Sequence, residues 1–169
     1  KGLNAVLADG VGNTAILEII ADGVRLDDFK LKGNVNTIAR HEKESLVKVY
    51  GSDFIIENGE VREASRHAIR VYGGGKEGKL TDGILRNING YNITRDVISL
   101  EGEGNEWPID NVTVENIKAY NSPERGVVEV SDGATNVTVS NIYGDSCRYG
   151  VCIQEHKPGQ SERNIRIEG

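Results

Sequence analysis

Short runs in which apolar and polar residues alternate recur along the whole chain. Alternation with a period of two, rich in Val, Ile and Thr, is typical of β-strands. Each run closes on a turn-forming residue, most often Asn, so each predicts a strand followed by a corner. The runs are DNVTVENI (110–117), TNVTVSNI (135–142) and RNIRIEG (163–169), with variants SDFIIENG (52–59), TDGILRNI (81–88) and the weaker DGVRLDDF (22–29).

A second kind of run lies between these in a fixed register. Its copies are ESLVKVYG (44–51), RHAIRVYGG (66–74), RDVISLEGE (95–103), RGVVEVSDG (125–133) and RYGVCIQEH (148–156). Alternation predicts that one apolar pair in each copy points inward. These pairs are Val47/Val49, Ile69/Val71, Ile98/Leu100, Val128/Val130 and Val151/Ile153.

The spacing of the closing residues indicates how the strands are arranged. Asn58, Asn87, Asn116 and Asn141 follow one another at intervals of 29, 29 and 25 residues, and Asp28 precedes the first by 30. Parallel strands usually need a helical crossover, yet no segment has helical periodicity long enough to form one. We therefore expect an all-β solenoid of about five to six coils of 25–30 residues, with an Asn ladder along one corner. The alternative, a β-sandwich with coincidental spacing, would not preserve two motifs and their register over five repeats.

The N-V-T-V-x-N-I motif, the following G-V-x-V strand and the Asn column resemble those of the right-handed parallel β-helix proteins of the pectin-lyase-like superfamily. The resemblance spans about residues 15–169, so we expect residues 1–169 to form a single right-handed β-helix domain. It also implies a secreted, extracellular or cell-surface protein. The first residues look like a partial coil and the last repeat stops at a corner. We expect either a segment of a longer solenoid or subunits that stack end to end or laterally.

Composition narrows the possible functions. The 21 Gly among 169 residues predict many tight turns, and 37% apolar content excludes disorder. A net charge of −6 argues against a nucleic-acid partner, and no apolar run is long enough to span a membrane. Cys147 and Cys152 form either a local disulfide or two free thiols. Neither a cofactor nor a metal is predicted, because no dense Asp cluster of the Ca²⁺-binding type occurs.

Superfamily members that act on polysaccharides use side chains that project outward from one sheet. In the equivalent strands here, four arginines form a column, one per coil: Arg66, Arg95, Arg125 and Arg148. The next column holds His67, Asp96, Gly126 and Tyr149, and the outward column within the strand holds Lys48, Arg70, Ser99, Glu129 and Cys152. An Arg column suits the carboxylates or sulfates of an acidic polysaccharide. The alternative is a surface ladder in which neighbouring carboxylates neutralise the arginines.

Asp96 and Glu129 are the candidate catalytic carboxyl groups. They lie on neighbouring coils, so they can reach the separation of about 5–5.5 Å used by retaining glycosidases or 6.5–9.5 Å used by inverting ones. A lyase would instead need a base such as one of the arginines. The long turns 73–80, 101–109 and 156–163 follow these strands, and they place Trp107 and His156 beside them as candidate substrate contacts.

Comparison with polygalacturonase-type hydrolases, which the chain resembles in register, finds most of their motifs missing. Asp96 matches the second Asp of their DD motif. Where NTD, GHG and RIK are expected, the chain has RHA with His67, RGV with Gly126 and VCI with Cys152. Two hypotheses therefore remain. One is a carbohydrate-active β-helix that engages or cleaves an acidic polysaccharide, and the other is a non-catalytic structural or adhesive β-helix of a surface, filament or phage fibre.

Overall fold

The computed structural model describes residues 3–6, 15–34, 45–73, 79–104, 106–156 and 158–169. All of its named elements are strands, and every pairing between them is parallel. Residues 74–78 of the predicted 73–80 turn lie outside the described residues. The strands are β1 (Leu3–Val6), β2 (Leu17–Ile19), β3 (Arg25–Lys32), β4 (Val47–Val49), β5 (Phe54–Arg62), β6 (Ile69–Tyr72), β7 (Leu80–Tyr91), β8 (Ile98–Glu101), β9 (Ile109–Ser131), β10 (Thr135–Gln154) and β11 (Arg163–Glu168).

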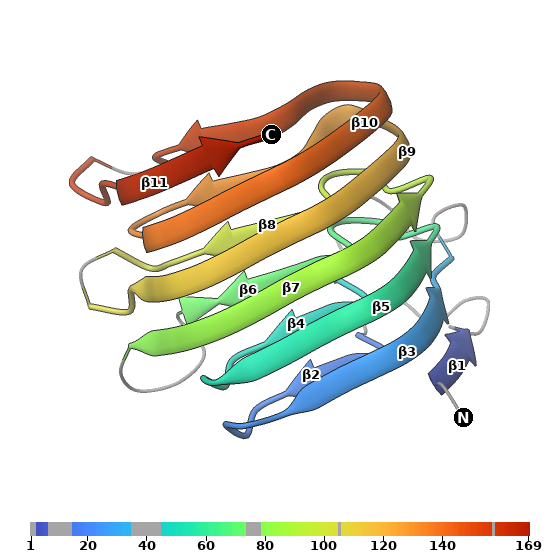
Figure 1. Cartoon of the computed structure of the whole chain (residues 1–169), viewed down its shortest axis with the longest axis horizontal. Helices are drawn as coiled ribbons and strands as arrows, with labels where there is room; N and C mark the ends of the chain where they lie inside the picture. Colours follow the sequence, from blue (N-terminus) through green and yellow to red (C-terminus); the bar gives the residue numbers. More distant parts are fainter. Residues whose placement is uncertain (1–2, 7–14, 35–44, 74–78, 105, 157) are drawn as a thin grey trace.

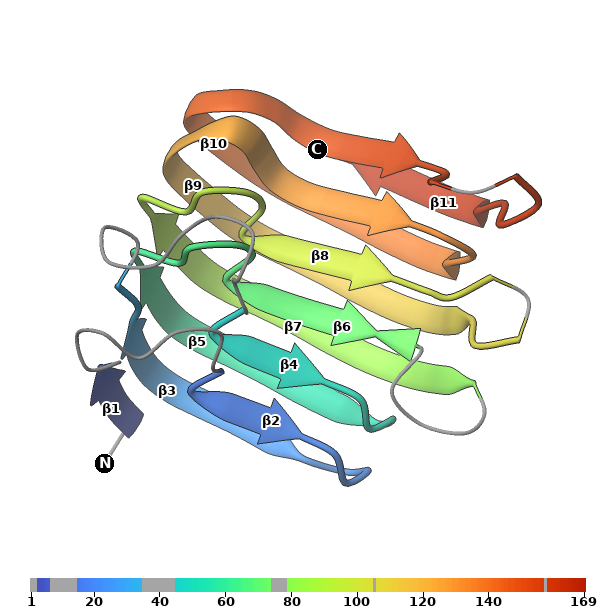
Figure 2. The same ribbon diagram turned by 180° about the vertical axis from the view of Figure 1, so that it is seen from behind.

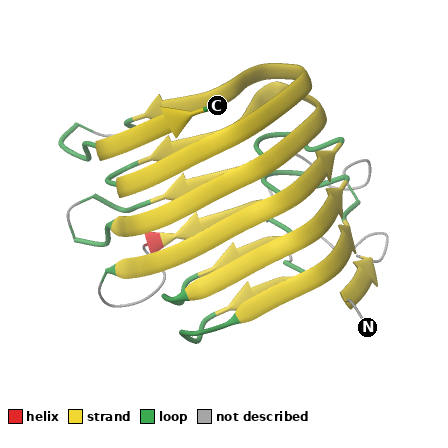
Figure 3. Ribbon diagram, viewed as in Figure 1, coloured by secondary structure: helices red, strands yellow, loops and turns green. Residues whose placement is uncertain are grey.

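The chain winds through two stacked layers of strands (Figure 3). One layer contains β3, β5 and β7 with the first parts of β9 and β10 (Figure 1), and the other contains β2, β4, β6 and β8 (Figure 2). β9 bends through both layers, because its first part pairs with β7 and its last part with β8. The result is a parallel β-helix of about five turns, which confirms the fold predicted from the repeats.

Corner residues with positive φ form three columns along the solenoid. The predicted column is one of them, and within it Asn116 Nδ2 donates to Asn87 Oδ1 at 3.1 Å and Asn87 Nδ2 to Asn58 Oδ1 at 3.0 Å. The corners rely on Asn and Asp, whose side chains tolerate the left-handed conformation, more than on the glycines that the composition suggested. The columns are Asp28, Asn58, Asn87, Asn116 and Asn141; Asp53, Asp82, Asn111, Asn136 and Asn164; and Glu63, Asn92, Asn121 and Ser146.

The core between the layers is aliphatic, with Phe29 and Phe54 as its largest side chains. Four of the five predicted inward pairs, from Val47/Val49 to Val128/Val130, are completely buried. The fifth differs, because Ile153 is 46% exposed. Among the described residues, the last part of β10 pairs only with β9, so nothing there covers its other edge.

Two further sequence expectations concern the chain as a whole. Cys147 and Cys152 are both free thiols rather than a disulfide. Within the described ranges, no helix has the length and apolar character that crossing a membrane requires.

Candidate functional site

A cleft of about 320 Å³ lies on the outer side of the layer that contains β6 and β8. The parallel register aligns Arg70, Ser99 and Glu129 on β6, β8 and β9, with Cys152 of β10 next to Glu129, and of these four residues Glu129 lines the cleft. This confirms the outward column predicted from the sequence. The cleft is lined by Arg66, Tyr72, Arg95, Glu101, Gly102, Glu103, Glu129, Asp132, His156 and Gln160.

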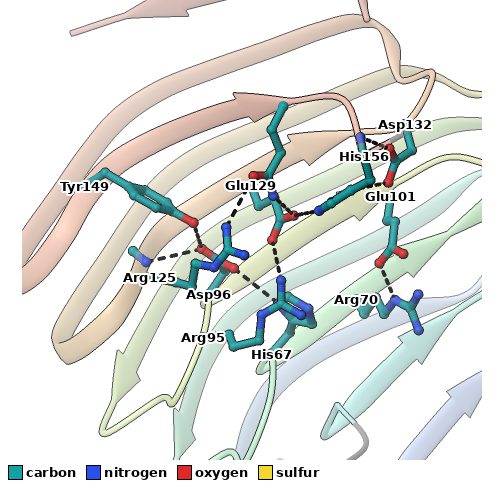
Figure 4. A network of polar contacts seen from close by, with 12 residues as sticks. His67, Arg70, Arg95, Asp96, Glu101, Arg125, Glu129, Asp132, Tyr149 and His156 are labelled. Atoms are coloured by element: carbon teal, nitrogen blue, oxygen red, sulfur yellow. Dashed lines mark hydrogen bonds and ion pairs between the residues drawn. The ribbon is translucent and has the colours of Figure 1, made fainter. Parts of the chain in front are cut away.

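Asp96 lies beneath the cleft and is fully buried. Its Oδ1 accepts a hydrogen bond from the Tyr149 hydroxyl at 2.8 Å (Figure 4). It also accepts one from the Gly126 backbone N–H at 3.2 Å. Gly126 permits this approach, because a Cβ at that position would lie 2.4 Å from the Tyr149 ring. Burial and the Asp96 carboxylate raise the pKa of Tyr149, so the phenol stays protonated and donates to Asp96.

Glu129 comes from the next coil and is also buried, but it reaches the floor of the cleft. Its Oε1 accepts a hydrogen bond from Gln154 Nε2, and its Oε2 lies 3.6 Å from Arg95 Nη2. Burial, together with the nearby Asp96 carboxyl group, raises the pKa of Glu129. The sequence therefore correctly placed Asp96 and Glu129 close together, although it did not predict that both would be buried.

His67 joins this pair from the preceding coil, where it is aligned with Asp96. It is 1% exposed, and its Nδ1 lies 3.4 Å from Asp96 Oδ2. Burial, and then the charge of Arg95, hold the pKa of His67 well below its ordinary value, so the ring is neutral. One potential ligand atom each from His67, Asp96 and Glu129 lies within 4.8 Å of the other two.

The four arginines of the predicted column have different environments. Arg66 and Arg95 line the cleft. Arg125 instead donates from Nη1 to Gln154 Oε1 at 3.3 Å. Arg148 is exposed and lies beside a register shift between Cys147 and Tyr149, outside the residues that line the cleft. The column is therefore not one continuous cationic strip.

His156 lines the cleft, whereas Trp107 lines a separate cavity. His156 Nδ1 lies 2.6 Å from Asp132 Oδ2, and its Nε2 lies 3.7 Å from Glu129 Oε1. Trp107 does not line the cleft. It lines a neighbouring cavity of about 460 Å³, and the two cavities share Glu103 and Gln160.

Three residues that shape the site were not selected from the sequence as site residues: Tyr149, Asp132 and Gln154. Tyr149 could have been selected from the sequence, because it follows Gly126 in the column that contains Asp96. Gln154 could also have been selected, since it aligns with Ser131 and Glu101. No sequence pattern indicates Asp132, because its contact with His156 joins two turns that differ from coil to coil.

No protein-family model matches the chain, and no curated protein matches it. Among solved structures, it is similar to one described as a "putative glycosyl hydrolase" from Parabacteroides merdae, with a TM-score of 0.62 and 11% sequence identity. The match covers 99% of this chain and 79% of that one. At this identity the likeness shows a shared β-helical fold and nothing about activity.

Proposed function

We propose that this chain is a carbohydrate-active β-helix that binds an acidic polysaccharide in the cleft over β6, β8 and β9 and cleaves it there. The observation that carries the proposal is the buried Asp96–Glu129 pair beneath a cleft whose wall contains Arg66 and Arg95. Guanidinium groups suit uronate carboxylates and sulfates, and a carboxyl group with a raised pKa, such as that of Glu129, suits general acid–base catalysis at a glycosidic bond. Such polymers lie outside cells, where we expect the protein to act.

The shape of the site supports a polymer rather than a small ligand. Glu103 and Gln160 line both the cleft and the cavity beside Trp107, so the two are neighbours and a chain of sugars long enough to reach both is the ligand we propose. Indole rings stack on sugar faces through the same amphipathic character that places them at polar interfaces. The name of the similar solved structure agrees with this class of ligand.

The two carboxyl groups have different positions, which suggests different roles. Glu129 lines the cleft and is the group that substrate can touch. Asp96 is covered by Tyr149 and held by the Gly126 N–H, so we assign it as a positioning residue. Arg66 and Arg95 are assigned as substrate contacts, with His156 at the outer edge.

The test is turnover on pectate, alginate and sulfated glycans, following both new reducing ends and the absorbance of unsaturated uronate. These two signals separate hydrolysis from elimination. Glu129→Gln should abolish turnover and retain glycan binding, whereas Arg66→Ala should weaken binding. The matched control is Glu115→Gln, which changes the same residue type on the other layer of the same strand, and it should retain both properties. Turnover that survives Glu129→Gln would contradict the assignment.

A non-catalytic structural or adhesive role is the second candidate. It is favoured by charged groups of the cleft that are already paired, as in Arg70–Glu101 at 2.8 Å and His156–Asp132 at 2.6 Å. Exposed apolar side chains such as Ile20 and Ile153 would favour stacking of copies. Concentration-dependent fibres in electron microscopy, together with no turnover on any glycan, would support this role over the first.

A further inference from the structure

Three buried polar atoms that accept or donate no hydrogen bond belong to one cluster. They are His67 Nδ1, Asp96 Oδ2 and Glu129 Oε2. Each residue is at most 1% exposed, and ligand-type atoms of the three lie within 4.8 Å of one another. His67 Nδ1 lies 3.4 Å from Asp96 Oδ2, and Glu129 Oε2 lies 3.6 Å from Arg95 Nη2, so these atoms have charged or polar neighbours but no hydrogen bonds. Buried polar atoms without hydrogen bonds are costly, so a ligand shared by all three would be stabilising.

The other oxygen of each carboxylate is already held by the protein. Asp96 Oδ1 accepts from Tyr149 and Gly126, and Glu129 Oε1 accepts from Gln154. Each carboxylate therefore has one oxygen anchored by hydrogen bonds, and a second oxygen whose neighbour, His67 Nδ1 for Asp96 and Arg95 Nη2 for Glu129, lies at 3.4 Å and 3.6 Å. Metal-binding carboxylates have this arrangement, because hydrogen bonds to one oxygen orient the other towards the ion.

We propose that His67, Asp96 and Glu129 bind a divalent transition-metal cation through one imidazole nitrogen and two carboxylate oxygens. This site goes beyond the proposed function and does not depend on it. A donor set of one nitrogen and two oxygens suits Zn²⁺, Mn²⁺, Fe²⁺ or Co²⁺, whereas Ca²⁺ and Mg²⁺ prefer oxygen ligands alone. Ligand atoms of a tetrahedral Zn²⁺ lie about 3.4 Å apart, so the cluster would contract by up to about 1.4 Å around it.

The charges in and around the cluster act in opposite directions. Two adjacent carboxylates attract a dication, and the His67 ring lies beside them with Nδ1 3.4 Å from Asp96 Oδ2, so a nitrogen ligand is close to both oxygens. Arg95 opposes binding, because its guanidinium lies 3.6 Å from Glu129 Oε2 and competes for that oxygen. Arg66 adds a second positive charge at the cleft wall. Removing Arg95 should therefore strengthen metal binding, the opposite of what general damage to the site would do.

The cleft gives an ion a route to the cluster, since Glu129 belongs to both. With three protein ligands, the site resembles catalytic zinc centres in leaving a further coordination position for water or another ligand. The sequence alone predicts no metal, because it lacks an Asp-rich motif of the Ca²⁺-binding type. The cluster proposed here joins residues from three coils and has no sequence motif.

The experiment is calorimetric titration of the EDTA-treated full chain with Zn²⁺, Mn²⁺ and Co²⁺, with Ca²⁺ for comparison. We expect one transition-metal ion per chain and much weaker binding of Ca²⁺. Co²⁺ held by protein ligands should show visible absorption bands. His67→Ala and Glu129→Gln should each weaken binding by about 100-fold or more. Glu115→Gln is the control and should leave binding unchanged, with circular dichroism verifying that each variant is folded.

The variant Arg95→Gln is a second test of the proposal, and it leaves all three proposed metal ligands in place. It should tighten metal binding by about tenfold, because one competing charge is removed. No binding of any of the three ions, or equal binding by wild type and His67→Ala, would overturn the proposal. So would tighter binding of Ca²⁺ than of Zn²⁺ and Mn²⁺. No glycan enters the measurement, so its result is independent of whether the chain cleaves polysaccharide.

Discussion

Glu57 and Glu129 are both buried glutamates that point away from the core, one on each layer of the solenoid, yet their surroundings differ. Glu57 Oε1 lies 2.5 Å from Arg25 Nη2, and its Oε2 lies 2.7 Å from Arg86 Nη2. Glu129 has one guanidinium at 3.6 Å and lies beside Asp96 and His67. The first carboxylate is neutralised from neighbouring coils, whereas the second is placed next to another acid.

The difference separates a structural face, on the layer that contains Glu57, from the face that holds the proposed site. Charge-assisted hydrogen bonds around Glu57 stabilise the stack and leave little capacity to bind anything else. The Asp96–Glu129 pair lowers the free energy of unfolding, because adjacent carboxyl groups and polar atoms without hydrogen bonds are unfavourable in a buried site. Sites that bind or react commonly carry such a cost, and the variants below test whether this one does.

The largest expected effect on the free energy of unfolding comes from the ladder formed by Asn58, Asn87 and Asn116. In Asn87→Ala, hydrogen bonds to Asn58 and Asn116 are lost and Ala must adopt a φ of 56°. The free energy of unfolding should fall by about 3 kcal/mol, since each hydrogen bond contributes about 1 and the left-handed conformation costs about 1 more. Urea unfolding measures it. Asn87→Gly should cost less, and equal losses for both variants would show that backbone conformation is irrelevant there.

Glu57→Gln should have the next largest effect. The amide cannot neutralise Arg25 and Arg86, so we expect a loss of about 2 kcal/mol, less than for a fully buried ion pair because both arginines are more than a third exposed. Raising the salt concentration should shrink the difference between wild type and variant. A loss that does not change with salt would mean that packing, not charge, makes Glu57 important.

Glu129→Gln should change stability in the opposite direction. Removing one of two adjacent acids relieves their repulsion, so the free energy of unfolding of metal-free protein should rise by about 1 kcal/mol. The same denaturation experiment as for Glu57→Gln measures it, and the two variants differ only in which layer they alter. If both variants destabilise equally, the distinction between the two faces is wrong.

The sequence predicted those features of the two faces whose residues repeat from coil to coil. The strands, the inward pairs and the Asn58–Asn87–Asn116 column recur in each coil and meet the same neighbours, so periodicity was sufficient to predict them. The site depends on residues that break the repeat. His67, Asp96, Gly126 and Tyr149 occupy one column but have different side chains, and only the geometry shows that Tyr149 crosses Gly126 to reach Asp96.

The errors have the same origin. Arg148 was grouped with Arg66 and Arg95 by spacing, but it is exposed and does not line the cleft. Burial of Glu129 was not predicted, because alternation indicates which side of a strand a residue faces and not what covers that side. Gln154 and His156 cover it from the next coil.

The smallest expected effect concerns pH and Asp110, a second carboxylate at the corners of the structural face. Burial raises the pKa of Asp110, but hydrogen bonds from Lys79 at 2.5 Å and from Thr135 and Asn136 at 2.6 Å outweigh it, so the pKa lies below its ordinary value of 3.8. A lowered folded-state pKa contributes stability that is present above the unfolded-state value and is lost as pH falls through the folded-state value.

Unfolding free energies measured from pH 5 down to pH 2 should therefore decline for wild type, and the decline should be shallower in Asp110→Asn below about pH 4. At pH 5 the variant should be less stable than wild type, because Lys79 loses its charged partner. The two curves should converge at the acidic end, where Asp110 is protonated in both states of the wild type. Parallel curves would show that Asp110 carries no pH-dependent stability.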